Sequence, residues 1–221
     1  MNYKNLNDIK TGDTLFFSNN GIVGNLIKIT NFSIWHHIGI AVRVSNGKIK
    51  RNKGELYVLE ISPSQRYDYF NGKYTKGISL TPIYSCLIRY NIISYRSIIY
   101  LKNKHIIKFT IDFINSNQNS MFANFAKSGF LILFNRNNNN KDLFCSNMVA
   151  KFYNEYYGKE IYNKHYNNIV PSDLINKESI FVQDELTNLY DCKSDLFSSV
   201  LQPIIIIVFF ILLVYMIIKK Y

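Results

Sequence analysis

The order of apolar and polar residues divides the first half of the chain into short strand-like runs. Apolar residues in these runs alternate with polar ones or follow one another without a break, and both patterns are typical of strands. The runs are Thr14–Phe17, His36–Val44, Leu56–Ile61, Gly77–Pro82 and Ser85–Tyr90. Turn signals stand at Gly12-Asp13 and at Asn46-Gly47, so we expect tight turns beside these strands.

Three other segments have apolar residues three or four positions apart, which is the spacing of one helix face. They are Ile22–Ile29, Lys102–Ser116 and Cys145–Tyr157. Gly158 follows the last of them, and glycine commonly stops helices because it adopts positive φ without strain. Strands that cluster early and helices that flank them predict an α+β fold.

The C-terminal segment Val200–Ile218 contains no charged residue. About 19 helical residues span roughly 28 Å, which is close to the thickness of a bilayer core. Pro203 lies in the first turn, where a helix tolerates proline. A buried helix that is apolar on every face needs a larger domain around it than this chain offers. We therefore expect a single C-terminal transmembrane helix, which makes the lipid bilayer a partner.

This anchor divides the chain into a soluble domain (1–182), a tether (183–199), the membrane span (200–218) and a short tail (219–221). No N-terminal signal peptide precedes the domain, so we expect the domain on the cytosolic side of its membrane. The acidic residues before the span and the two lysines after it favour the opposite orientation by the positive-inside rule, but so short a tail is able to cross.

Composition and charge narrow the choice of partners. The formal net charge is +11, but the lysines are scattered and form no basic stripe with interleaved aromatic residues, so we expect no nucleic-acid partner. Heavy use of Lys, Asn, Ile and Tyr is typical of AT-rich coding sequences and suits a virus or a protist; a viral source would place the protein in a virion or host membrane. Three cysteines, Cys86, Cys145 and Cys192, are an odd number without metal-motif spacing, so we expect free thiols in a reducing compartment and no metal or cofactor.

One of these cysteines stands where its sulfur would be activated. Cys145 begins a predicted helix, where unpaired N–H groups and the helix dipole favour a thiolate. His37, at the start of a predicted strand, supplies a base, and Gly39 beside it leaves room for another backbone or a substrate. Glu60 on a neighbouring strand can orient the imidazole, which is the third role in a catalytic triad. Taken singly, each of these residues has a commoner structural explanation.

Five segments share an order that carries further information. They are residues 9–15 (IKTGDTL), 35–42 (WHHIGIAV), 58–61 (VLEI), 144–149 (FCSNMV) and 170–174 (VPSDL). In this order they resemble the NlpC superfamily of papain-fold cysteine hydrolases, in the circularly permuted branch that includes YiiX-like bacterial proteins and poxvirus relatives. The family histidine stands directly before a hydrophobic residue and glycine, which selects His37 over His36. Asn147 departs from the family, whose members commonly have glutamate at that place.

The resemblance implies a permuted papain-like core, in which a mostly antiparallel sheet packs against the helix that carries the nucleophile. It also implies a membrane-anchored cysteine hydrolase that cleaves an amide bond of a peptide or an acyl amide. Cys145 would attack the carbonyl and form an acyl-thioester, with His37 as its base and Glu60 orienting the imidazole. The backbone N–H of Cys145 is the natural first oxyanion donor.

Two alternatives keep the fold but change the function. The same triad serves a lipid acyltransferase or phospholipase in relatives of lecithin:retinol acyltransferase. Their usual nucleophile motif NCEHF and third histidine differ from FCSNM and Glu60 here, although a membrane anchor would hold the site beside lipid. The second alternative is a membrane-tethered scaffold without enzymatic activity.

The remaining histidines and cysteines fit structural roles. We expect His36 to be a half-exposed strand residue, His105 a structural residue within a helix, and His165 a loop residue. Cys86 is expected to be buried in a strand, and Cys192 to be an unmodified linker residue, with palmitoylation as the alternative.

Overall fold

One antiparallel sheet forms the centre of the molecule. The computed structural model describes residues 6–21, 24–25, 27–28, 33–96, 103–120, 143–160, 165–175 and 187–191. Within these ranges the strands are β1 (Thr14–Ser18), β2 (His37–Ser45), β3 (Lys48–Lys50), β4 (Glu55–Asp68), β5 (Lys73–Pro82), β6 (Ile92–Arg96) and β7 (Thr187–Asp191). Their order across the sheet is β5-β4-β2-β1-β6-β7, with β3 paired to β2. All these pairs are antiparallel.

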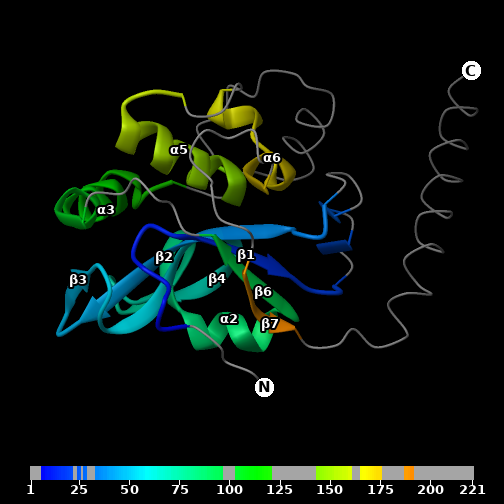
Figure 1. Cartoon of the computed structure of the whole chain (residues 1–221), viewed down its shortest axis with the longest axis horizontal. Coiled ribbons are helices and arrows are strands. Elements are labelled where there is room, and N and C mark those ends of the chain that lie inside the picture. The colour runs from blue at the N-terminus through cyan, green and yellow to red at the C-terminus, as the bar shows by residue number, and fades with distance from the viewer. Residues whose placement is uncertain are drawn as a thin grey trace, which may run out of the picture.

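Helices lie on both faces of this sheet. They are α2 (Ile83–Arg89), α3 (Asn103–Asn117), α5 (Cys145–Tyr157), α6 (Pro171–Ile175) and the 3-10 helix η2 (Tyr166–Asn168). Figure 1 shows α3, α5 and α6 on one face of the sheet and α2 on the other. The architecture is therefore a mixed α+β fold, as the sequence predicts.

Each face of the sheet has its own hydrophobic core, because successive side chains of a strand point to opposite faces. On β4, Leu59 packs in the core that includes Met148 and Phe152 of α5. Its neighbour Val58 packs in the second core, with Cys86 of α2. The two cores hold α5 and α2 in fixed positions relative to β2 and β4.

Several predicted elements are confirmed within one or two residues. The strands β1 and β2 and the helices α3 and α5 occupy their expected ranges. Gly158 has φ 65° and ends α5 as expected. Asn46 and Gly47 both have positive φ, which is typical of a tight hairpin turn, and this turn joins β2 to the short strand β3.

One predicted strand is a helix. The segment that we expected to be a strand at 85–90 belongs mainly to α2. Ile83, Cys86 and Tyr90 are buried at intervals of three and four residues, whereas Tyr84 and Ile88 are 64% and 84% exposed. The segment is short enough to match both periods, and only the helical one buries a single face. Cys86 is therefore a buried helix residue and not a strand residue.

A strand also lies in the segment that we expected to be a tether. β7 pairs with β6 and extends the sheet, so the folded domain continues beyond residue 182. None of the helices within the described ranges combines the length and the apolar composition needed to cross a bilayer. The predicted membrane span 200–218, the tail 219–221 and Cys192 lie outside those ranges.

The free edge of β5 is covered by the hairpin that it forms with β4. The pairing of these strands shifts register between Ser62 and Arg66, and the end of the hairpin folds back along β5. The N–H of Tyr69 donates to the carbonyl oxygen of Leu80 at 3.0 Å. The N–H of Leu80 donates to Oδ1 of Asp68 at 2.9 Å. Both backbone groups of Leu80 on this edge are therefore bonded within the chain.

Candidate active site

The structure brings Cys145, His37 and Glu60 together. His37 is the first residue of β2, Glu60 lies on the adjacent strand β4, and Cys145 is the first residue of α5. Nε2 of His37 is 2.6 Å from Oε2 of Glu60. The sulfur of Cys145 shares a hydrogen bond with the same imidazole. Because Nε2 faces Glu60, Nδ1 is the ring nitrogen that remains for the sulfur.

Gly39 permits the close approach of β2 and β4 at this point. A Cβ atom on Gly39 would lie 2.5 Å from Cγ1 of Val58 and 3.0 Å from the carbonyl oxygen of Leu59. Any side chain at this position would push β4 away from β2. Gly39 was expected to leave room for another backbone or a substrate, and the structure places there the backbone of the strand that carries Glu60.

The first turn of α5 is hydrogen-bonded to the loop before α6, a segment that contains η2 and Ile169. Oδ1 of Asn147 accepts the N–H of Phe144 at 3.2 Å, and Nδ2 of Asn147 donates to the carbonyl oxygens of Tyr166 and Ile169 at 2.7 and 3.1 Å. Oγ of Ser146 also donates to the Ile169 oxygen, at 2.7 Å. A glutamate at position 147 would lack the two N–H donors that these carbonyls use. The departure of Asn147 from the resembling family therefore has a structural explanation.

Two opposing effects act on the thiol of Cys145, a residue that is 7% exposed. Burial alone would raise its pKa. The hydrogen bond and charge of His37, together with the backbone N–H groups of Ile38 and Ser146, outweigh burial and lower the pKa of Cys145 below its usual value. These N–H groups include the start of α5, where the helix favours negative charge. The site therefore favours the thiolate.

The partners of this thiolate alternate in charge. Burial would lower the pKa of His37, but its hydrogen bonds to Cys145 and Glu60 and their negative charges raise that pKa to about 9. Burial would raise the pKa of Glu60, but the hydrogen bond and charge of His37, the charge of Arg89 and a hydrogen bond from Thr81 lower it to about 2. At neutral pH Glu60 is therefore a carboxylate and His37 an imidazolium, and the imidazolium favours ionisation of the Cys145 thiol.

Two arginines that the sequence did not single out lie beside Glu60. Nη2 of Arg89 is 3.2 Å from Oε1 of Glu60, and Nε of Arg66 is 3.8 Å from the same oxygen. Arg89 follows Cys86 by three residues, so a helical interpretation of this segment would have placed both on the face toward the sheet. The interpretation as a strand hid this relation.

Aromatic rings pack around the imidazole. The rings of Tyr90 and His37 are stacked, with centroids 5.7 Å apart and planes 11° apart. Phe17 of β1 lies at 5.7 Å from the same imidazole. These contacts limit the rotation of His37 and support the orientation that Glu60 sets.

The three other histidines are not members of this triad. His36 is buried, not half-exposed, and burial lowers its pKa to about 3. Its Nδ1 accepts the N–H of Asn19 at 3.4 Å. His105 is exposed on α3 and not enclosed as a structural residue. His165 caps η2 by accepting the N–H of Asn167.

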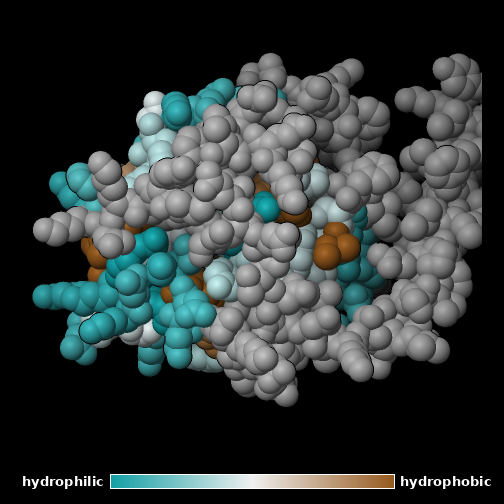
Figure 2. All heavy atoms as spheres, viewed as in Figure 1, coloured by the Kyte–Doolittle hydropathy of each residue, from teal (hydrophilic) through white to brown (hydrophobic). Residues whose placement is uncertain are grey.

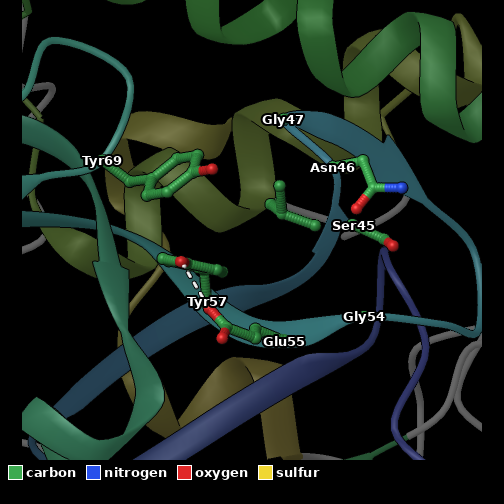
Figure 3. A pocket seen from close by; sticks show the side chains of 8 residues that line it. Ser45, Asn46, Gly47, Gly54, Glu55, Tyr57 and Tyr69 are labelled. Carbon is green, nitrogen blue, oxygen red and sulfur yellow. Dashed lines mark hydrogen bonds between the residues drawn. The ribbon is translucent and has the colours of Figure 1, made fainter.

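A separate cavity of about 340 Å³ lies at the other end of β2. Figure 3 shows Tyr69, Asn46 and Glu55 around it, with the Tyr57 hydroxyl donating to Oε2 of Glu55 at 2.9 Å. This end of β2 is about 26 Å from His37 at 3.3 Å per residue, so the cavity is not adjacent to Cys145. Hydrophilic side chains gather on the surface around the nearby strand β3 (Figure 2). Three exposed lysines there are Lys48, Lys50 and Lys53.

The site contains no obvious metal centre among the residues with a described position, because no three of their His, Cys, Asp or Glu side chains are arranged to hold an ion.

No protein-family model matches the chain, and no curated protein matches it. Among solved structures, the chain is similar to the metalloprotein YiiX from Escherichia coli O157:H7. Sequence identity is 13%, the TM-score is 0.49, and the alignment covers 81% of this chain and 96% of YiiX.

Proposed function

We propose that the protein is a membrane-anchored cysteine hydrolase with a permuted papain-like core, and that it cleaves an amide bond. One observation carries the proposal: contacts run from the Cys145 sulfur through His37 to Glu60, where Nε2 and Oε2 are 2.6 Å apart. A structural cysteine in a core needs no such partners. A thiol at a helix start beside an oriented imidazole has the arrangement of an activated nucleophile.

The proposed reaction has two halves. The Cys145 thiolate attacks the carbonyl carbon, a C–S bond forms, and one electron pair of the C=O bond moves to oxygen. The His37 imidazolium then gives its proton to the amide nitrogen, the C–N bond breaks, and the amine leaves behind an acyl-thioester. Neutral His37 next takes a proton from water as the hydroxide attacks the thioester. The C–S bond breaks, and a carboxylic acid leaves while the thiolate and imidazolium are restored.

The remaining groups have supporting roles in this proposal. Glu60 keeps the imidazole in one orientation and balances its charge in both halves. The N–H of Cys145, at the first position of α5, has no acceptor inside its own helix, so it is suited to bind the developing oxyanion. The tie between Asn147 and the loop before α6 fixes where that N–H stands.

The first test is labelling of the full-length protein by an active-site-directed thiol probe, in a Cys192→Ser background. We expect labelling at Cys145 at neutral pH, lost in Cys145→Ala and reduced by about 10²-fold in His37→Ala because the buried thiol then lacks its base. Cys86→Ala is the matched control and should keep full labelling. Folded, reduced protein that resists the probe would favour the non-enzymatic scaffold.

The second test concerns the substrate. The unlabelled enzyme is offered a panel of peptide amides, acyl amides and acyl lipid esters, and acyl-thioester on Cys145 is measured by mass spectrometry. We expect acylation by amides. Acylation by lipid esters alone would replace the amidase assignment with the lipid acyltransferase or phospholipase, because the same triad serves both chemistries.

A further inference from the structure

We propose that Arg89 is a positioning residue for this site: its cation completes a buried row of alternating charges and holds Glu60 ionised and aimed at His37. The inference rests on the proposed function, since it concerns how the same nucleophile is activated. Arg89 touches neither the sulfur nor a substrate. It acts through Glu60 and His37.

Two partners fix the orientation of the Glu60 carboxylate. Glu60 is fully buried, and its two oxygens have different partners. Oε2 meets Nε2 of His37 at 2.6 Å, and Oε1 accepts from Nη2 of Arg89 at 3.2 Å. With one oxygen fixed on each side, the carboxylate plane has a single favourable orientation. Releasing Oε1 would leave Glu60 free to turn away from the imidazole.

Arg89 also balances the net charge of the buried row. A thiolate, an imidazolium and a carboxylate together have a net charge of −1, and a buried net charge is unfavourable unless it is paired. Arg89 brings the sum of the row to zero. Nε of Arg66 is also near Oε1 but at 3.8 Å, which is beyond hydrogen-bond distance. We therefore expect Arg66 to have the smaller effect.

Arg89 is held in place by contacts other than the one with Glu60. Its Nε donates to the carbonyl oxygen of Ser85 at 2.9 Å, and Nη2 also contacts Sγ of Cys86 at 3.2 Å. Its guanidinium lies 5.6 Å from the centre of the Tyr90 ring, and Tyr90 in turn stacks on His37. The cation is therefore presented to Glu60 by α2 and is not a mobile surface counter-ion.

The sign of the expected effect follows from the groups that face this row. On the β2 side this is His36, which lies behind His37. Arg66 faces the row from β4 and Thr81 from β5, and Cys86 and Tyr90 face it from α2 and its end. Burial raises the pKa of Cys86 and Tyr90 and lowers that of His36, so all three are neutral near pH 7. Removing the positive charge of Arg89 makes proton loss harder for every group in the row, so the Cys145 thiolate forms only at higher pH.

The experiment measures the rate of iodoacetamide alkylation against pH in the full-length Cys192→Ser protein, by mass spectrometry of the peptide that contains Cys145. We expect Arg89→Met to move the midpoint upward by about one pH unit. Arg89→Lys retains the charge and should stay within a few tenths of a unit of the parent. Arg66→Met should move it less than Arg89→Met, and so should Cys86→Ala, which removes one contact of Arg89 but leaves its bonds to Ser85 and Glu60.

The outcomes separate this inference from the proposed function. If Arg89→Met is folded and its midpoint equals that of the parent, the role of Arg89 is refuted while the nucleophile stands. If Cys145 is not alkylated in the parent, both ideas fail together. Should methionine prevent folding, Arg89→Gln offers a neutral side chain that still donates hydrogen bonds. Equal midpoints in the glutamine and lysine variants would then overturn the inference, because only lysine restores the charge.

Discussion

The two faces of the sheet each bury a cysteine, and the two thiols differ in chemistry. Cys145, on the α5 side, is 7% exposed, and Cys86, on the α2 side, is fully buried. Burial raises the pKa of both thiols. His37 and two backbone N–H groups reverse that effect for Cys145, whereas the nearby carboxylate of Glu60 raises the pKa of Cys86 further. Depth of burial therefore does not decide which thiol ionises; the donors and charges around the sulfur decide it.

Replacing each sulfur by oxygen should give the largest difference between the two faces. Cys145→Ser substitutes a hydroxyl that does not ionise near pH 7, so we expect turnover of an amide substrate to fall by roughly 10⁴-fold. Cys86→Ser changes no group that meets the substrate and should reduce only the stability, by about 1–3 kcal/mol for a buried hydroxyl. Steady-state kinetics and urea unfolding of both variants measure this. Equal losses of turnover would contradict the comparison.

Removing the charge of Glu60 should affect both faces, because Glu60 contacts His37 and the Arg89 side chain beside Cys86. Glu60→Gln leaves an imidazolium and the arginines without their carboxylate, so we expect the free energy of unfolding to fall by about 3–5 kcal/mol. Chemical denaturation at pH 7 measures the change. Glu55→Gln, on an exposed carboxylate of the same strand, is the matched control and should change the stability by less than about 0.5 kcal/mol.

The same variant tests the acid dependence of stability. The pKa of Glu60 is about 2 in the folded chain and about 4.3 when unfolded, which corresponds to about 3 kcal/mol. Because the folded value is the lower one, this stability is present above about pH 4.3 and is lost as the pH falls toward 2. We expect the unfolding free energy of the parent to fall more steeply than that of Glu60→Gln between about pH 5 and 2. Parallel curves would contradict the buried carboxylate.

The smallest effect should come from the tie that holds the start of α5. Asn147→Asp keeps the acceptor for Phe144 but loses the donors to Tyr166 and Ile169, so we expect a loss of about 1–3 kcal/mol in stability. The alkylation rate of Cys145 should fall, whereas that of Cys86 in unfolded protein should not change. Asn115→Ala, on an exposed position of α3, is the control. An Asn147→Asp variant whose Cys145 is alkylated at the rate of the parent would show that the loop before α6 does not position the nucleophile.

Much of the fold follows from local sequence. The long apolar run of β2, and the pattern of α5 with Gly158 at its end, each fit one period and have clear ends. The segment of α2 is short and fits both the strand period and the helix period, so its packing in the core on the α2 face of the sheet decides its structure. The polar strand β7 has no local signal, and it forms because β6 offers a partner. Sequence alone does not reveal that tertiary pairing.

The candidate site, like the fold, is predicted from the sequence only in part. Cys145, His37 and Glu60 were singled out from motifs that resemble one family, each motif lying within a few neighbouring residues. Arg89 lies 29 positions from Glu60, and its contact depends on how α2 packs beneath β4. A guanidinium beside this carboxylate is therefore a product of packing: helical spacing places Cys86 and Arg89 on one face of α2, but only the packing of α2 brings that face to Glu60.

The hairpin that covers β5 has a consequence for association. The outward N–H and carbonyl of Leu80 are already bonded to Asp68 and Tyr69, so an extended peptide finds no vacant groups at that point of the edge. Growth of the sheet by addition of another strand is hindered there, and such growth is the route by which β-rich chains form insoluble fibrils. A partner or a substrate in extended conformation therefore cannot pair with Leu80 on this edge.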